Sequence, residues 1–534
     1  MTVLDAFDRR IQAKFSDVLH TREDMHSYQD DLAVPWLLAN PFSFLLISMG
    51  MGKSVISLTV ITDVLNELTY AGPVLVIGPM RVATQTWPNE IREWLHTAHL
   101  NHSLIHIPDD HPEVLDAARK GRAQARLQGM GQGEAASAGN AAAQACKERL
   151  RIAATRSKAS LHIIPINWVE WLVDYWGPKW PYRIVFIDES SMMKDHKTNR
   201  FKALAKVRNH PGLIERMHLL TATPAAESYL NFFAQTFLID GGKRFGVHIT
   251  HYHKRYFTQN RYTRKWEIRP GGEEDILAKI ADISLVMKAE DYLNLEEPSI
   301  IRRPIKLGPA EMALYKRMET DFVVTLPDGS EVEAATAAAL SQKLLQMASG
   351  MLYETYLDED LETEDFKKVK KVHHVHDQKI EELQQLVEEA QGQPVLVSYH
   401  WQSSLTRLKK AFPNAVVMDR EGKCVKKWNA GKIPMLLMHP QSGGHGLNLQ
   451  RGGHILAIYD LFYSLELFIQ LVGRLARQGQ KHKVMVYIFT ALDTLDEAVA
   501  DALRAKEDAQ DKMFRMLRRL IKKHRRTRDN DDTL

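Results

Sequence analysis

The sequence predicts an α/β fold in which two parallel-sheet domains follow one another along the chain. Short apolar runs rich in β-branched residues recur, and a helical pattern follows each of them. This alternation indicates a parallel sheet that helices cover on both faces. It fills the first half of the chain and resumes late in the second half. The expected strands are 42–48, 73–79, 103–107, 161–166, 182–188, 217–222, 394–400, 415–419, 434–439, 454–460 and 484–490.

Length and composition are those of an ordinary globular protein. A chain of 534 residues with 45% hydrophobic and 25% charged residues is too long for one hydrophobic core. The net charge of +4 is small, so any contact with nucleic acid must depend on local clusters. Two distant cysteines, Cys146 and Cys424, argue against disulfides or zinc and favour a reducing cytosol. Without a secretory signal or a convincing membrane span, we expect a soluble intracellular protein.

Several segments fall outside the predicted sheets. Residues 117–156 have Ala-rich flanks around a Gly-rich middle, which favours a helical hairpin, with a disordered loop as the alternative. Residues 251–266 mix basic and aromatic side chains, so DNA contact and a solvated surface are both open. The acidic stretch 353–366 is expected to face solvent, and the histidine-rich 373–376 to be a linker rather than a metal site. The basic stretch 514–528 is expected to contact DNA, brace the two domains or remain solvated.

A phosphate-binding loop is predicted directly after the first strand. Gly50 and Gly52 let backbone N–H groups curl around phosphates at a helix N-terminus. Lys53 would pair with the β- and γ-phosphates, and Ser54 with Mg²⁺. Ile47 replaces the first glycine of the general pattern, so a helix N-cap beside a surface lysine stays an alternative.

An acidic pair, Asp188 and Glu189, ends another strand. Ligands of open parallel sheets bind at the carboxyl ends of strands, where a phosphate loop also belongs. Asp188 can hold Mg²⁺ through water, and Glu189 can polarise the attacking water. Thr221 and Thr223 follow the next strand, where their hydroxyls could bridge from the acidic pair to another surface.

Polar residues of the second domain complete the predicted machinery. Gln470, Arg474 and Arg477 recur at helical spacing, which places them on one helix face among apolar neighbours. Arginines that one domain supplies to a γ-phosphate held by another are worth about 10³–10⁵ in rate. The glycine-rich stretch 442–449 permits close approach to a phosphate of ATP or nucleic acid, although a plain turn is the simpler interpretation.

In this order, the motifs resemble helicase superfamily two and, within it, the Swi/Snf-like double-stranded DNA translocases. The resemblance covers residues 22–500. It is carried by "SMGMGKS", "GPMRVATQTWPNEIREW", "FIDESSMMKD", "SGGHGLNLQRGGHILAIYD" and, most specifically, "QLVGRLARQGQKHKVMVYIF". The family's phosphate loop normally lacks the first glycine, so the resemblance also accounts for Ile47.

The resemblance implies ATP and Mg²⁺ as cofactors and assigns further site residues. Tyr28 and Gln29 look like the adenine-reading motif, and Gln470 joins the nucleotide site. The implied catalytic residues are Lys53, Asp188, Glu189, Arg474 and Arg477. The implied nucleic-acid contacts are Arg81, Thr84, Gln85, His400, Trp401, Gly443 and Gly444.

Four of the motifs depart from the family pattern without losing a catalytic group. Ile47-Ser48 stands where the family has two acids, and His26 where it has an arginine. Ser190-Ser191 replaces Ala-His, which puts the histidine-mediated link to the third motif in doubt. The third motif reads T-A-T instead of T-G-T.

The resemblance implies two RecA-like domains with helical insertions. We expect a helical lead at 1–24, an ATP-binding domain at 25–240 with a helical insertion at 110–156, and a linker with a helical insertion at 241–375. A helicase C-terminal domain at 376–500 and a basic helix and tail at 501–534 follow.

The expected activity is that of an ATP-dependent motor that hydrolyses ATP at the interface of the two domains while it tracks along double-stranded DNA. A strand-separating DNA or RNA helicase is the alternative, and a degenerate ATPase acting as a DNA clamp is disfavoured. Single-stranded DNA or RNA stays open as a substrate. We expect a monomer of bacterial or bacteriophage type in the bacterial or infected-host cytosol, with replication or recombination proteins as partners and no membrane association.

Overall fold

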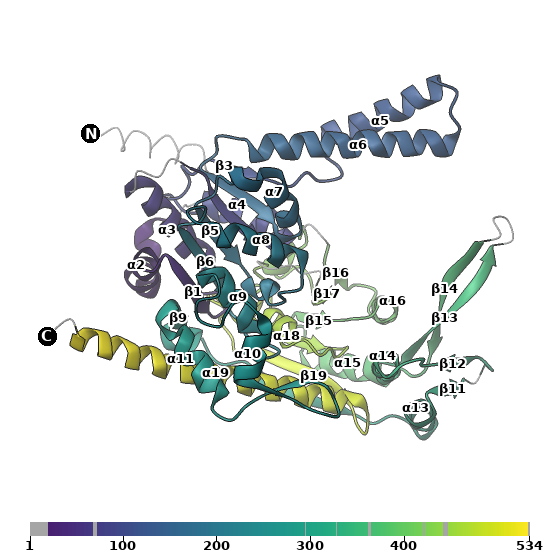
Figure 1. Ribbon diagram of the computed structural model, residues 1–534. Coiled ribbons are helices and arrows are strands. Elements are labelled where there is room, and N and C mark those ends of the chain that lie inside the picture. The colour runs from purple at the N-terminus through teal and green to yellow at the C-terminus, as the bar shows by residue number, and fades with distance from the viewer. Residues whose placement is uncertain are drawn as a thin grey trace. The chain divides into compact units, whose positions relative to one another are not determined.

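The structure, a computed structural model, describes residues 20–67, 72–293, 295–326, 328–360, 365–419, 422–441 and 447–531. The chain divides into two compact units. Unit 1 comprises the chain up to Ser48, Gly52–Met287 and the chain from Phe514 on, and unit 2 comprises Met49–Met51 with Lys288–Met513. Each unit has one large sheet, and all the strand pairs of both sheets are parallel (Figure 1). The predicted fold class is confirmed.

The sheet of unit 1 has seven strands in the order β3-β4-β2-β5-β6-β1-β9. Every residue of β2, β4 and β5 is buried, as expected for strands that are covered on both faces. The first six strands along the chain are the six that the sequence predicts. The strands are β1 (Phe42–Ile47), β2 (Val74–Gly78), β3 (His102–Leu104), β4 (Leu161–Pro165), β5 (Ile184–Asp188), β6 (Arg216–Thr221) and β9 (Ser284–Met287).

Helices connect these strands in the alternation that the sequence indicates. The main ones are α2 (Val34–Ala39), α3 (Lys53–Glu67), α4 (Trp87–Glu93), α7 (Val169–Trp176), α8 (Asn199–Asn209) and α9 (Asn231–Asp240). All residues of α9 from Phe232 to Asp240 are buried, which explains why its sequence is apolar all round.

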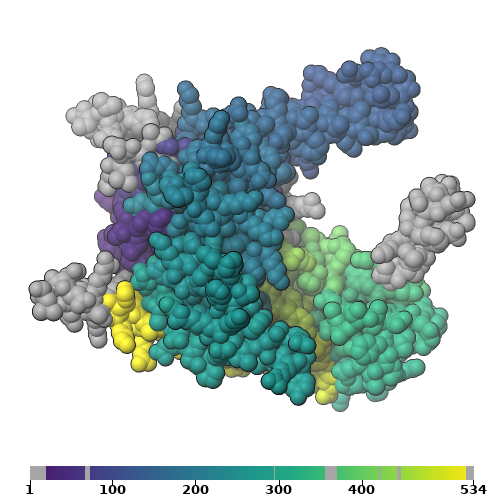
Figure 2. Space-filling view, in the orientation of Figure 1, coloured from purple at the N-terminus to yellow at the C-terminus, as the bar shows by residue number. Residues whose placement is uncertain are grey.

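A helical hairpin projects from unit 1, as Figures 1 and 2 show. It consists of α5 (Pro112–Leu127) and α6 (Gln132–Thr155), so the predicted hairpin is confirmed. The two helices approach closely at Gly139, where an added Cβ would lie 2.8 Å from the carbonyl oxygen of Ala118. At its base, the Arg151 guanidinium lies 3.6 Å from the ring centroid of Trp168, and the Trp171 indole donates to Glu148.

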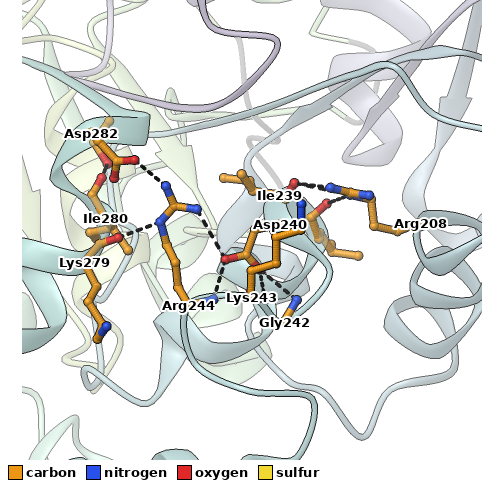
Figure 3. A network of polar contacts seen from close by, with 11 residues as sticks. Arg208, Ile239, Asp240, Gly242, Lys243, Arg244, Lys279, Ile280 and Asp282 are labelled. Carbon is orange, nitrogen blue, oxygen red and sulfur yellow. Dashed lines mark hydrogen bonds and ion pairs between the residues drawn. The ribbon is translucent and has the colours of Figure 1, made fainter. Parts of the chain in front are cut away.

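Between α9 and β9, the chain of unit 1 makes an excursion whose two ends are tied together. The excursion contains α10 (Ile249–Tyr256), β7 (Phe257–Gln259), β8 (Trp266–Ile268) and α11 (Gly272–Ile280). Arg244, at its start, donates from Nε to the carbonyl of Lys279 at 2.7 Å and pairs with Asp282 (Figure 3). The buried Asp240 carboxylate accepts the backbone N–H groups of Gly242 and Arg244 at 2.7 and 2.9 Å, which caps the end of α9.

The sheet of unit 2 has six strands in the order β10-β19-β18-β15-β17-β16. Alternate residues of its strands point into two separate hydrophobic cores, one containing Leu396 and Leu456, the other Val397 and Ala457. This alternation is the mark of a sheet that is covered on both faces. The strands are β10 (Ser299–Ile305), β15 (Val395–Ser398), β16 (Val416–Val417), β17 (Met435–Met438), β18 (Ile455–Ile458) and β19 (Met485–Ala491).

A smaller cluster with its own core lies between β10 and β15 along the chain of unit 2. Its core includes Tyr315, Met318 and Val324. Its elements are α13 (Pro309–Asp321), β11 (Val323–Thr325), β12 (Glu331–Glu333), α14 (Ala337–Ala348), β13 (Met351–Asp360) and β14 (Asp365–His374).

The ion pair of Lys379 with Asp496 lies in unit 2 with both side chains fully buried. The Lys379 ammonium is 2.7 Å from the Asp496 carboxylate and donates to the carbonyl of Tyr459 at 3.1 Å. Burial raises the pKa of Asp496, and the charge of Lys379 opposes that shift. Such a pair is costly to break by removing one partner, because the other charge stays buried.

The segment 241–375, expected as a linker with a helical insertion, contributes to both sheets. β9 pairs with β1 in unit 1, and β10 pairs with β19 in unit 2. The expectation that 373–376 is a linker is wrong, because His373 and His374 belong to β14 and pair with Leu352 and Met351. The proposed domain boundaries stay a prediction.

At its C-terminal end, the described chain forms one long helix, α19 (Leu495–Asp531), which confirms the predicted basic C-terminal helix. Residues 1–19 of the predicted lead at 1–24 lie outside the described residues. The side chains of residues 355–369 lie outside them as well. Within the described residues, no helix has both the length and the apolar content that a membrane span needs.

The helical hairpin offers a matched pair of glycine substitutions. A Cβ at Gly133 meets no heavy atom within 4 Å, whereas a Cβ at Gly139 meets backbone. Gly133→Ala should stabilise the hairpin by about 0.5–1 kcal/mol through helix propensity. Gly139→Ala should destabilise it by about 1–3 kcal/mol through overpacking. Hydrogen exchange of the 112–155 amides measures both changes, and a change of the same sign in both variants would contradict the packing.

Candidate nucleotide site and nucleic-acid contacts

Three motif-bearing loops leave the same edge of the unit 1 sheet from adjacent strands. β6 lies between β5 and β1, and Leu220 is in register with both Asp188 and Leu45. The loop after β1 carries the glycines, the end of β5 carries the acidic pair, and the turn after β6 carries Thr221 and Thr223. Parallel pairing therefore brings the predicted phosphate loop and acidic pair to one edge.

The glycines of the phosphate loop have backbone angles that favour glycine. Gly50 and Gly52 have φ of +77° and +79°, in the left-handed region. A Cβ at Gly52 would also lie 2.3 Å from Nε2 of Gln29. Gly52 is thus required both for its backbone angle and for the close approach of Gln29 to the loop.

Tyr28 and Gln29 lie buried in the π-helical segment η2 (Tyr28–Ala33). Gln29 accepts the backbone N–H of His26 at 2.9 Å and donates from Nε2 to the Tyr28 hydroxyl at 3.3 Å. The His26 ring stacks on Tyr28 with centroids 5.3 Å apart, so the histidine that replaces the usual arginine packs on the tyrosine. Burial raises the pKa of Tyr28 to about 12, so its hydroxyl stays protonated.

Lys53 begins α3 and faces the acidic pair. Its ammonium lies 3.7 Å from the Glu189 carboxylate, and the side chains are only 11% and 5% exposed. Glu189 has φ of 53°, an uncommon angle for a residue with a side chain. The structure therefore brings together the lysine and the carboxylate that the sequence predicts as partners in phosphate chemistry.

Asp188 is fixed by two donors. Its carboxylate accepts the Trp87 indole N–H at 3.0 Å and the backbone N–H of Glu189 at 3.0 Å. Trp87 is fully buried, and sequence reasoning noted it only as part of a motif, without a role. Its contact with Asp188 spans 101 residues of sequence, so no local pattern could reveal it.

Asp188 and Ser54 fit a Mg²⁺ ion of the kind that binds largely through phosphates. Such an ion uses one or two carboxylates, waters and substrate phosphates instead of a cage of protein ligands. In the described part of the chain, no group of three or more His, Cys, Asp or Glu side chains could hold a metal ion.

A glutamine on α9 links the acidic motif to the turn after β6. Ser190 donates from Oγ to Oε1 of Gln235 at 3.0 Å, and Gln235 donates to the carbonyl of Pro224 at 2.8 Å. The Ser190 and Gln235 side chains are fully buried. The Ser190-Gln235 link therefore connects the two motifs through the residue before Ser191, which stands where the family pattern has a histidine. The sequence did not predict the role of Gln235.

In unit 2, the expectation that Gln470, Arg474 and Arg477 share one helix face is wrong. Helix α18 (Leu465–Val472) carries Gln470 and ends before both arginines, with Gly473 as its C-cap. The chain then turns, and the carbonyl of Arg474 accepts the N–H of Leu449 at 3.2 Å. Gln470 and Arg474 are buried, and Arg477 is half-buried.

Asp460 organises the loop after β15 that contains two predicted nucleic-acid contacts. The backbone N–H groups of His400 and Trp401 both donate to its Oδ2, at 2.8 and 3.2 Å, and Ser404 donates to its Oδ1 at 3.0 Å. His400 and Trp401 are half-buried. Asp460 itself is fully buried at the end of β18 and was not predicted as part of a site.

The remaining predicted contacts lie after β2 and in the glycine loop. Arg81 donates from Nε to Gln85 at 2.9 Å across the π-helical turn η3 (Val82–Thr86), and Thr84 is half-buried in the same turn. Gly443 and Gly444 lie outside the described residues.

Comparisons with known proteins give a family model, similar sequences and similar solved structures. A family model described as the SNF2-related domain matches residues 36–243. Protein p41 of Acyrthosiphon pisum secondary endosymbiont phage 1 is 31% identical over 484 residues, which cover 88% of this chain and 94% of that protein. The uncharacterized ATP-dependent helicase YqhH of Bacillus subtilis (strain 168) is 23% identical and covers 61% of this chain and 58% of that protein. A Sulfolobus solfataricus SWI2/SNF2 ATPase core in complex with dsDNA is 15% identical, with a TM-score of 0.39 over 93% of this chain and 94% of that one.

The Ser190-Gln235 link can be tested by a double-mutant cycle. Gln235→Leu should cost about 1–3 kcal/mol of stability, because it leaves two buried polar groups unpaired. Ser190→Ala should cost about 1 kcal/mol. The double variant should be little worse than Gln235→Leu alone, because both substitutions remove the same bond. Denaturant unfolding measures the cycle, and strictly additive costs would show that the two side chains do not interact.

Proposed function

We propose that this chain, which belongs to the Swi/Snf-like, SNF2-related branch of helicase superfamily two, is a DNA-dependent ATPase that translocates along double-stranded DNA. Family membership makes it an SNF2-type, helicase-like motor that binds ATP. The phage relative of nearly equal length agrees with the expected short bacteriophage type. The observation that best supports ATPase activity is the Lys53-Glu189 pair beside Asp188, whose side chains are almost fully buried. A degenerate ATPase would not need to retain this pair.

We assign the steps of phosphate chemistry in unit 1 to residues at one sheet edge. The Lys53 ammonium pairs with the Glu189 carboxylate in the structure. When ATP binds, the ammonium would leave this carboxylate and pair with the β- and γ-phosphates. That exchange leaves the Glu189 carboxylate to orient and polarise the attacking water. A Mg²⁺ ion held by Ser54 and Asp188 would neutralise charge on the phosphates. Trp87 holds the Asp188 carboxylate in place through its indole N–H.

Adenine recognition is proposed for Tyr28 and Gln29. The contact of Gln29 with Gly52 ties base recognition to the phosphate loop, because a shift of one displaces the other. Arg474 and Arg477 are proposed to stabilise the γ-phosphate in the transition state. Gln470 is proposed to join the nucleotide-binding group.

Contacts with DNA are proposed for two loops with fixed backbones. Arg81, Thr84 and Gln85 share the turn after β2, and His400 and Trp401 are held by Asp460. Gly443 and Gly444 are proposed to approach the strand through their backbone. Contacts of this kind go mainly to phosphates, so binding should be insensitive to sequence and sensitive to salt.

The first test is ATP hydrolysis with closed duplex DNA, single-stranded DNA or RNA in separate reactions. Closed duplex should stimulate hydrolysis most. Lys53→Ala, Glu189→Gln and Arg477→Ala should each abolish the stimulated rate, and loss of the arginine should cost about 10³–10⁵.

Exposed residues of each unit supply matched controls for these variants. Lys158→Ala in unit 1 and Arg317→Ala in unit 2 also remove one positive charge, yet both side chains are exposed. They should leave the stimulated rate unchanged. Wild-type turnover by Glu189→Gln or Arg477→Ala would overturn the site, whereas strongest stimulation by single strands or RNA would favour the strand-separating helicase.

A further inference from the structure

The β-hairpin of strands β7 and β8 presents one aromatic ring entirely to solvent. The two strands pair antiparallel from Phe257 to Ile268, and residues 260–265 form the turn. Tyr262, in the turn, is 97% exposed, and no other ring of the described residues contacts it. A tyrosine placed in this way contributes nothing to the core of unit 1.

The β7–β8 hairpin packs at its base on a cluster of buried aromatic side chains. Tyr252, Tyr256 and Phe257 are buried next to one another, and the rings of His253 and Trp266 stack with centroids 4.3 Å apart. Arg244 closes the root of the whole excursion through its bonds to Lys279 and Asp282 (Figure 3). Packing at the base therefore holds the exposed tip in a defined place on unit 1.

The turn itself is ordered and carries a strained residue. Oδ1 of Asn260 accepts the backbone N–H groups of Tyr262 and Thr263 at 3.0 and 3.1 Å. Arg264 has φ of +57°, a left-handed position at which hairpin loops prefer glycine. An arginine that occupies such a position at a cost in stability points to a use for its charge.

Positive charge surrounds the exposed ring. Arg261, Arg264 and Lys265 are all exposed, and no carboxylate of the described residues lies within ion-pair distance of them. The acid of the hairpin, Glu267, instead accepts the side-chain amide of Asn260 at 2.9 Å. The tip thus combines one flat aromatic face with three cations.

We propose that the β7–β8 tip binds DNA at a junction between duplex and single strand, where Tyr262 stacks on an unpaired base and Arg261, Arg264 and Lys265 contact the adjacent phosphates. Stacking on an aromatic ring together with backbone contacts by cations is the general mode of single-strand binding. A protein partner fits less well, because Tyr262 has no apolar neighbours on the tip and interface anchors sit in apolar pockets. The proposal rests on the proposed DNA motor and adds a second, junction-specific contact to it.

The test compares binding to two DNA molecules of the same duplex sequence. One is a covalently closed circular duplex, which has no unpaired bases, and the other carries a single-stranded overhang. The wild-type protein should bind the overhang form at least about fivefold more tightly, since one stacked base is worth this much or more. Tyr262→Ala should remove the preference, and Tyr262→Phe, which keeps the stacking face, should retain it. An unchanged preference in Tyr262→Ala would overturn the proposal.

Two further variants distinguish a lost DNA contact from misfolding. Tyr292→Ala removes a partly exposed tyrosine from another element and should retain the wild-type preference. Arg264→Gly places glycine at a left-handed position, so it should unfold at no lower temperature than the wild type while it loses affinity for the overhang form. Unchanged affinity in Arg264→Gly would exclude the arginine from the contact.

The outcomes separate this proposal from the proposed motor. Duplex-stimulated ATP hydrolysis without any preference for the overhang form would overturn the junction contact and leave the motor standing. A preference for the overhang form that depends on Tyr262, found without stimulation of ATP hydrolysis by DNA, would overturn the motor and support the contact.

Discussion

The proposed nucleotide site depends on one constraint, the parallel order β5–β6–β1 of three adjacent strands in the sheet of unit 1. Each strand ends in a loop that carries a different chemical group, and parallel pairing forces all three loops to one edge. The Lys53-Glu189 pair and the placement of Asp188 follow from that order. β9, the outer neighbour of β1, makes β1 an interior strand and so keeps the strand before the phosphate loop buried.

Links between motifs in this chain are made by side chains to which the sequence analysis assigns no role. Trp87 binds Asp188, Gln235 joins Ser190 to the turn after β6, and Asp460 fixes the backbone of His400. Each is buried and satisfied by hydrogen bonds, so each positions its partner without contacting a substrate. Gln235 gives this chain a link between the acidic motif and the turn after β6, although Ser191 stands where the family has a histidine.

The sequence predicts most of the two sheets because their strands are continuously apolar and bounded by turns. It does not predict β9, which has only four residues directly after a helix. It does not predict β10 either, because this edge strand alternates half-buried and exposed positions. The strand also carries Arg302 and Arg303, which pair with Asp501 and Glu382. Helix α18 ends at Val472, with Gly473 as its C-cap. Helical spacing alone therefore wrongly placed Arg474 and Arg477 on the helix face of Gln470. Contacts across a hundred residues, such as that of Trp87, leave no periodic signal in a single sequence.

Displacement of a third strand from a DNA triplex tests the central claim most directly, because it reports movement along a duplex without requiring its strands to separate. With ATP, the wild-type protein should release the third strand while the duplex stays paired, and Glu189→Gln should release none. Separation of the duplex itself, or ATP hydrolysis without release of the third strand, would contradict translocation along double-stranded DNA.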